Sequence, residues 1–285
     1  MAVSAQTVKE LREKTGAGFM DKKALEESGG DFEKAIKLLK EKGLADAQKR
    51  AGREAKEGLI TVIESSDKNE ILMVEINCET DFVSRTDKFR NFVEETAKMI
   101  LDKGISSVEE IDEEIETKVK ENAGSFGENI VLRRIARFKK SDPEKSVFWS
   151  YIHLDGKVGV IAEFIVDPPD VSNSEEFKEF AKNISLQIAS MNPVSISRND
   201  FPEDVLKEQR EIYAKQAKES GKPEKIIDKI VDGRMNKFFA ESCLLEQKYV
   251  KDNEITVEKY KKSIEDKLGC TIEIKRFKRF KLGEE

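Results

Sequence analysis

The spacing of apolar residues over positions 3–43 predicts three short helices. The first helix ends at the glycine-rich turn 15–18, because glycine interrupts a helical pattern. The second ends at Ser28-Gly29-Gly30-Asp31, and Asp31 can cap the helix that follows. The third ends at Gly43, and we expect the Ala- and Lys-rich segment 44–57 to be a solvated helical linker.

The next part of the chain alternates between strand and helix patterns. Apolar runs bounded by turn residues predict strands at 59–64, 70–77, 130–138, 148–154 and 157–166. Helical periods cover 87–103 and the acidic segment 107–122, and Gly104 and Gly124 are expected to end these two helices. These elements together predict a mixed α+β core.

The core also contains an internal repeat. A shift of 88 residues places Glu75 on Glu163, Val83 on Val171, Ser84 on Ser172, Phe89 on Phe177 and Phe92 on Phe180. Two related strand–turn–helix units are the simplest account, so we expect a duplicated α+β core. The second copy has Pro168-Pro169-Asp170 where the first has Thr80-Asp81-Phe82. This difference indicates that the fold does not require Phe82.

The last third of the chain is mainly helical. Apolar residues over 203–246 predict a helical hairpin with Gly221-Lys222-Pro223 at its tip, since proline is tolerated in the first turn of a helix. Its isoleucines and phenylalanines are most simply the seam between the two arms, although a protruding arm could also support self-association or partner contact. A final helix over 256–268 ends at Gly269, and 271–282 returns as a strand.

The composition favours a soluble protein of two or three small domains. With 51 basic and 57 acidic residues among 285, the net charge is −6, whereas a dedicated nucleic-acid binder usually carries a basic excess. The three cysteines lie far apart, which favours reduced thiols in a cytosolic protein. Neither a membrane-spanning apolar run nor a signal or transit segment is evident. We therefore expect a cytoplasmic protein with no membrane partner.

No motif indicates catalysis, a cofactor or a metal. A single histidine, His153, excludes a multi-histidine metal site, and a Cys/His nucleophile pair stays only formally open. The glycine-rich segments 15–18 and 124–127 lack the lysine and hydroxyl residue of a phosphate-binding loop, so we interpret them as helix-breaking turns. We expect no enzyme activity, no cofactor, no metal and no direct nucleotide binding.

The most informative segment is Ile76–Arg85, where a strand pattern runs into Thr80-Asp81-Phe82-Val83, here called the TDFV turn. A phenylalanine at a strand–helix turn can be presented outward as an anchor for another protein. Alternatively, Phe82 closes the core at the strand end and Asp81 caps the next helix. The residues alone leave both interpretations open.

Three motifs in the chain resemble elongation factor Ts, the nucleotide exchange factor of translation elongation factor Tu. They are LREKTGAGFMDKKAL at 11–25, INCETDFVSR at 76–85 and KIVDGRMNKF at 229–238. The resemblance covers nearly the whole chain. One departure is Lys22, where many relatives carry cysteine, and no functional consequence is expected from it.

The resemblance implies a fold with an N-terminal three-helix ubiquitin-associated-like domain, a duplicated α+β core, a helical hairpin (coiled coil) and a small C-terminal module. We expect the three-helix domain at 1–54 and the first core subdomain, with the TDFV turn, at 55–140. The second core subdomain would follow at 141–202, the hairpin at 203–246, and the completion of the core with the C-terminal module at 247–285.

The resemblance also implies a function and a partner. Such a factor binds elongation factor Tu in its GDP-bound and nucleotide-free forms and promotes GDP release. Thr80, Asp81, Phe82 and Val83 would enter near the magnesium and phosphate site of the GTPase. Further contacts implied by the resemblance are Arg12, Met20, Lys22, His153 and Met235. The complex with the partner could also form a homodimer.

The basic and aromatic tail Lys275–Lys281 suggests an alternative function. Alternating bases and aromatics can bind RNA, which would make the chain a ribosome- or RNA-associated adaptor without exchange activity. The other interpretation is a strand with Phe277 and Phe280 packed inward and the basic side chains solvated. We favour the strand, because a net acidic chain opposes a polyanion, and nucleic acid is not expected as a partner.

Overall fold

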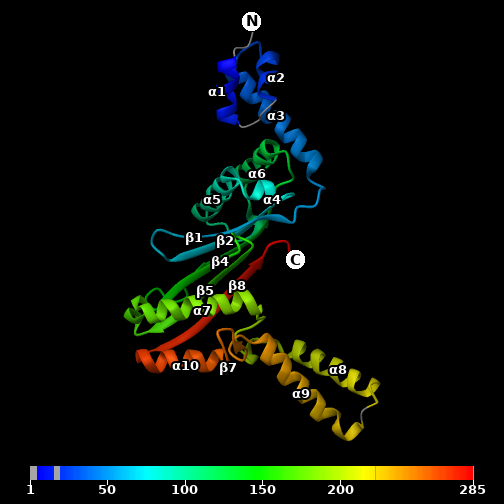
Figure 1. Ribbon diagram of the computed structural model, residues 1–285, viewed down its shortest axis with the longest axis vertical. Coiled ribbons are helices and arrows are strands. Elements are labelled where there is room, and N and C mark those ends of the chain that lie inside the picture. Colours follow the sequence, from blue (N-terminus) through cyan, green and yellow to red (C-terminus); the bar gives the residue numbers. More distant parts are fainter. Residues whose placement is uncertain (1–4, 16–19, 222, 285) are drawn as a thin grey trace. The chain divides into compact units, whose positions relative to one another are not determined.

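The computed structural model describes residues 5–15, 20–221 and 223–284, which form a mixed α+β protein (Figure 1). The described chain divides into two compact units. The first contains the chain up to residue 138, with 152–159 and the C-terminal segment from Phe280. The second contains 139–151 and 160–279. Among the described residues, no helix is both long and apolar enough to cross a bilayer.

The N-terminal part consists of α1 (Ala5–Thr15), α2 (Met20–Glu27) and α3 (Phe32–Arg50). Most of the predicted turn 15–18 lies outside the described residues. Asp31 caps α3 as expected, since its carboxylate accepts a hydrogen bond from the Lys34 N–H at 3.0 Å. A small cluster of Leu11, Ala24, Leu25 and Ala35 is fully buried between these helices.

The prediction that the third helix ends at Gly43 is wrong, because α3 continues to Arg50. Gly43 instead lies against Gly124 of α6 (Glu113–Phe126), and a Cβ added at Gly124 would meet the Gly43 Cα at 2.6 Å. Both glycines are therefore helix-crossing positions, and Gly124 does not separate two elements. The segment after Gly43 is not simply solvated either, since Ala47 is buried in the core of the first unit.

The first sheet has the order β1 (Glu57–Glu64), β2 (Glu70–Cys78) and β3 (Val131–Lys139). Strands β1 and β2 are antiparallel, and Leu59 faces Ile76 across the ladder. After β2 come α4 (Asp81–Ser84) and α5 (Asp87–Asp102), and α5 packs on β1 and β2 with α6 beside it (Figure 1). The acidic helix predicted at 107–122 starts later than expected. A 3₁₀ turn occupies Val108–Glu110, and Asp112 caps α6.

The second sheet has the order β4 (Ser146–His153), β5 (Val158–Asp167) and β8 (Thr271–Lys281). A 3₁₀ turn, η2 (Pro169–Asn173), and α7 (Glu175–Met191) follow β5. A further 3₁₀ turn, η3, covers Arg198–Asp200 before the hairpin α8 (Glu203–Glu219) and α9 (Glu224–Ser242). The two-stranded sheet β6 (Lys248–Tyr249) and β7 (Asp252–Thr256), which the patterns do not predict, and α10 (Val257–Leu268) complete the chain.

The two sheets share the elements that the repeat predicts. Strand β2 corresponds to β5, the short helix α4 to η2, and α5 to α7. Glu75 and Glu163 are both fully buried, and each pairs with an arginine of the third strand: Arg134 for Glu75 and Arg276 for Glu163. A buried carboxylate needs such a partner and further donors. The repeat therefore extends to two buried carboxylates that each pair with a partly exposed arginine.

The carboxylate of Glu163 should make the protein acid-sensitive. Burial acts to raise its pKa, but donors from Ser141 and Ser146, and the charge of Arg276, lower it below the usual 4.5. A group with a lowered folded-state pKa stabilises the protein above its unfolded pKa, and this contribution is lost as the pH falls through the folded pKa. We expect Glu163→Gln to reduce the free energy of unfolding at pH 7. The difference from wild type should shrink in urea titrations below pH 4.5, and a constant difference would contradict this.

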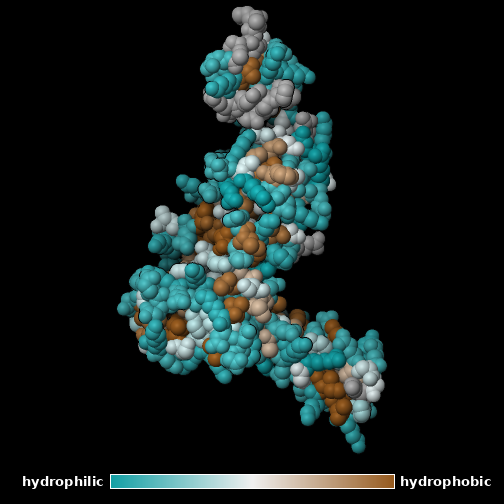
Figure 2. Space-filling model, viewed as in Figure 1, coloured by the Kyte–Doolittle hydropathy of each residue, from teal (hydrophilic) through white to brown (hydrophobic). Residues whose placement is uncertain are grey.

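The hairpin is a packing unit of its own. Helices α8 and α9 lie side by side and bury Ile227, Val231, Met235 and Phe239 between them (Figure 1). Hydrophobic atoms also reach its surface in Figure 2, and Val205, Ile212 and Ile226 are exposed there. The Ile and Phe stripe is thus mainly the seam of the hairpin. Lys222 at the predicted tip lies outside the described residues.

The basic and aromatic tail forms β8, as the strand interpretation predicts. Phe277 and Phe280 do not both point inward, however, since an odd separation puts them on opposite faces of a strand, and only Phe280 is buried. The basic residues are also not simply solvated. The Arg276 Nε donates to Glu163 at 2.6 Å, and the Arg279 Nε donates to the carbonyl of Ala189 at 3.1 Å.

Candidate functional site

Phe82 is the most exposed large apolar side chain among the described residues, with 82% of its surface accessible. It lies on α4, a helix of only four residues that directly follows the end of β2. The core interpretation of Phe82 is therefore wrong for this structure. An aromatic residue presented on a short turn is a favoured anchor in protein interfaces, so its position is suited to contact with another molecule.

Two other residues of the TDFV turn, Thr80 and Val83, face inward and fix α4. Thr80 caps the helix, and its hydroxyl accepts a hydrogen bond from the Val83 N–H at 3.4 Å. Val83 packs against the core of the first unit, and the Ser84 hydroxyl donates to the carbonyl of Asp81 at 3.2 Å. Asp81, the second residue of the turn, forms an ion pair with Arg85 at 2.9 Å. Phe82 is thus the apolar member of the turn that is aimed at solvent.

Glu128, which no motif in the sequence singles out, lies directly behind the turn. Its carboxylate accepts hydrogen bonds from the N–H groups of Glu79 and Thr80 at 2.9 and 3.0 Å, and from the Thr80 hydroxyl at 2.5 Å. Nearly fifty residues separate it from the turn, and no local pattern links the two. Only the position of Glu128 just after the glycine that ends α6 could have drawn attention to it.

Cys78 lies buried beneath the turn, in a setting that disfavours its thiolate, which is the nucleophilic form. Burial, aided by the negative charge of Glu128, raises the pKa of its thiol to about 12. The thiol donates to the carbonyl of Thr80 at 3.2 Å. The three cysteines, all among the described residues, are free of disulfides. The Cys/His pair that stayed formally open therefore gains no support.

The second copy provides an internal comparison. Pro168 begins η2 where Thr80 begins α4, and it offers no side-chain cap. Asp170 occupies the place of Phe82 and is also exposed. Both copies thus expose this position, while only the first places an aromatic ring there.

The other predicted contact residues are spread over the chain. Arg12 lies in α1 and Met20 begins α2, but their side chains lie outside the described part of the structure. Lys22 is exposed on α2, 3.7 Å from Glu26. His153 is exposed at the end of β4 beside Leu154, which is also exposed. Met235 is only 2% exposed in the hairpin seam, so its side chain offers no surface to a partner here.

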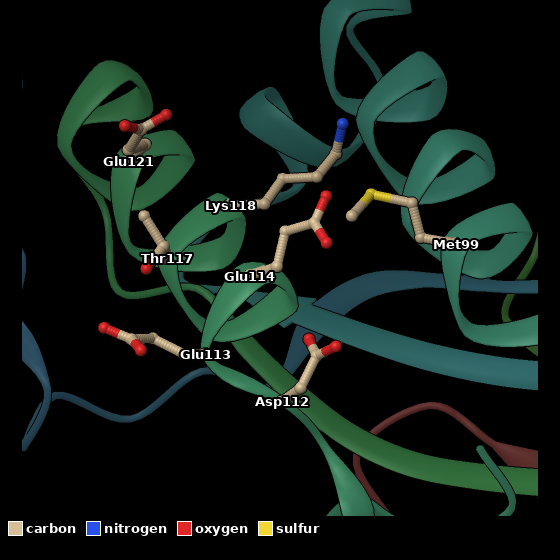
Figure 3. A pocket seen from close by; sticks show the side chains of 7 residues that line it. All are labelled: Met99, Asp112, Glu113, Glu114, Thr117, Lys118 and Glu121. Atoms are coloured by element: carbon tan, nitrogen blue, oxygen red, sulfur yellow. The ribbon is translucent and has the colours of Figure 1, made fainter. Parts of the chain in front are cut away.

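A hollow of about 680 Å³ between α5 and α6 is also lined by charged side chains, but their arrangement indicates neither a catalytic nor a metal site (Figure 3). Glu114 and Lys118 point toward Met99 across it, while Glu113 points away (Figure 3). Asp112 and Glu114 are both paired with Lys103, which lowers the pKa of Asp112. No group of His, Cys, Asp and Glu within the described ranges could hold a metal ion.

Comparison with known proteins gives a consistent result. The family model described as "Elongation factor TS" matches residues 79–284. Elongation factor Ts of Trichlorobacter lovleyi is 42% identical over 294 residues, covering 100% of this chain and 94% of the relative. The proteins of that name from Clostridium kluyveri and Aquifex aeolicus are each 44% identical, covering 99% of this chain and 93% and 99% of the relatives.

Proposed function

Because the chain belongs to the elongation factor Ts family, we propose that it is the guanine nucleotide exchange factor for elongation factor Tu. Members of this family are known as nucleotide exchange factors for that GTPase. The single observation that carries the mechanistic part is the 82% exposure of Phe82 on a rigidly capped turn. Phe82 would enter the GTPase near its magnesium and phosphate site, with Asp81 beside it.

The physical basis is the way a GTPase holds its nucleotide. Mg²⁺ and the amides of the phosphate-binding loop bind the β-phosphate through charge and oriented donors. A small displacement of these groups weakens several strong contacts together. The factor binds the nucleotide-free partner more tightly than the GDP form, and by linkage GDP then weakens binding of the factor by the same ratio. No nucleotide site on this chain is required.

The direct test is release of a fluorescent GDP analogue from purified elongation factor Tu, with and without this chain. We expect the chain to accelerate release in proportion to its concentration until the partner is saturated. Unchanged release would refute the proposal. The alternative, an RNA-associated adaptor, would instead show salt-sensitive RNA binding. The basic tail gives little support to this RNA-binding alternative, because Arg276 donates a hydrogen bond to the Glu163 carboxylate and Arg279 donates one to the Ala189 carbonyl.

The hairpin should contribute little to exchange. Its helices bury their own seam, so replacing residues 212–231 by a short glycine-serine turn should leave both sheets intact. We expect the release rate of GDP to stay within about 3-fold of the full-length value, because separate packing units are nearly additive. Loss of exchange together with an unchanged circular dichroism melting curve for the remaining core would contradict this expectation.

A further inference from the structure

We infer that Glu128 is a positioning residue that holds the Phe82 side chain in its presented place. The inference rests on the proposed exchange function and concerns the same site. It starts from the three hydrogen bonds between the Glu128 carboxylate and residues Glu79 and Thr80, here called the Glu128 clamp. Phe82 itself makes no part of the clamp.

The clamp controls the direction in which α4 leaves the sheet. The N–H groups of Glu79 and Thr80 follow the last residue of β2 and precede the first residue of α4. Both N–H groups donate to one oxygen of Glu128, while the hydroxyl of Thr80 donates to the other. Hydrogen bonds to a carboxylate are stronger than neutral ones. A helix of four residues has little internal stability, so its orientation depends on these bonds.

Glu128 is in turn held by its own surroundings. Gly127 ends α6 with a φ of 74°, which turns the chain toward β3. The next N–H, of Asn129, donates to the Glu79 carboxylate at 2.7 Å, and the Asn129 side chain donates to the carbonyl of Arg53 at 2.7 Å. The Glu128 carboxylate thus accepts hydrogen bonds from the segment that contains Glu79, and the Glu79 carboxylate accepts one from the segment that contains Glu128. This reciprocal pairing fixes both sides of the turn.

The second copy lacks the clamp and also lacks the aromatic residue. Arg134 corresponds to Arg276, and Gly127 corresponds to Gly269, which ends α10 with a φ of 64°. Counting from these pairs, Glu128 corresponds to Cys270, and Thr80 corresponds to Pro168, which has no N–H to donate. The same strand–turn–helix unit therefore forms in the second copy without a clamp. This indicates that the clamp is needed to orient Phe82 and not to form the fold.

The test combines exchange kinetics with a double-mutant comparison. Glu128→Ala should slow release of the GDP analogue by about 10-fold or more, because a misplaced interface anchor no longer fills its pocket in the partner. Glu128→Gln, which keeps one acceptor oxygen, should lie between this variant and wild type. In the Phe82→Ala background, Glu128→Ala should change the rate by less than about 2-fold, since the two residues act as one unit. Full additivity of the two losses would overturn the inference.

Two further measurements separate positioning from general damage. Glu265→Gln is the matched control, because Glu265 is a half-buried carboxylate of the second copy that accepts the Ile272 N–H at 2.8 Å. It should leave exchange unchanged. Hydrogen exchange at the amides of Glu79 and Thr80, which are protected in wild type, should accelerate in both Glu128 variants. Unchanged protection of these amides would overturn the clamp.

If the wild-type chain does not accelerate GDP release from elongation factor Tu, the proposed exchange function fails. The hydrogen-exchange measurement at the two amides still decides whether the clamp exists. If Glu128→Ala does not fold, Glu128→Gln decides, and exchange at the wild-type rate would refute the inference.

Discussion

Phe82→Ala should slow GDP release from elongation factor Tu by about 30-fold to 1,000-fold while leaving the melting temperature of the chain nearly unchanged. An aromatic anchor that fills a partner's pocket is typically worth about 2–4 kcal/mol when truncated. Phe82 has 82% of its surface in solvent, so its removal takes little from the fold. A buried phenylalanine such as Phe177 would instead cost the fold about 3–5 kcal/mol on truncation. Fluorescent GDP release and thermal melting measure the two effects separately.

Two control variants sharpen this result. Asp170→Ala changes the equivalent exposed position of the second copy and should leave both exchange and melting unaffected. Val194→Ala removes another exposed apolar side chain, 72% accessible, and should also be silent. Asp81→Ala should act in the same direction as Phe82→Ala but more weakly, since an exposed ion pair contributes little. A Phe82→Ala protein that melts early yet exchanges normally would show that the ring serves the fold.

Glu75→Ala should destabilise the protein by about 3–5 kcal/mol, because breaking a buried ion pair leaves a charge without its partner. Glu75 is fully buried, and the Arg134 Nε donates to its Oε2 at 2.7 Å. Its Oε1 accepts from the Asn77 side chain and from the Gly283 N–H, each at 3.1 Å. All three donors lose their acceptor in the variant. Urea unfolding monitored by circular dichroism gives the free energy directly.

A surface pair serves as the comparison for Glu75. Asp266 forms an exposed ion pair with Lys262 at 2.8 Å, so Asp266→Ala should cost less than about 0.5 kcal/mol. The double variant Glu75→Leu with Arg134→Met should recover most of the lost stability, since apolar residues of similar volume often replace a buried pair without loss. Equal effects of Glu75→Ala and Asp266→Ala would contradict the assignment of Glu75 as a structural charge.

The sequence predicts most elements of this fold because their signals are local. Apolar runs in 70–77 and 157–166 lie close to the bounds of β2 and β5, and the 88-residue repeat aligns these two segments with each other. Gly43 shows where local reasoning fails. Glycine usually ends a helix, but here it continues one because Gly124 of a distant helix needs the space. Nothing within a few residues of Gly43 carries that information.

The candidate site divides in the same way. The TDFV turn can be found from its order of strand, polar turn and helix, and the failed repeat at Asp170 points to a special role for Phe82. Glu128 cannot be found, because the bonds it makes to Glu79 and Thr80 join segments nearly fifty residues apart. The resemblance of motifs implies that Met235 contacts the partner. The structure buries its side chain in the hairpin seam, and the sequence motif alone does not reveal this burial.

The bond from Gly283 to Glu75 has a consequence for how the chain is made. Synthesis runs from the N-terminus, so β1, β2 and β3 leave the ribosome well before the residue that completes the set of donors around Glu75. Arg134 and the neighbouring Asn77 can pair with Glu75 early, but the Gly283 N–H joins them only after β8 has been synthesised. The nascent first unit therefore lacks one donor to a buried carboxylate until the segment after β8 has been made, and we expect a chain truncated before Phe280 to be less stable and more readily cleaved by proteases.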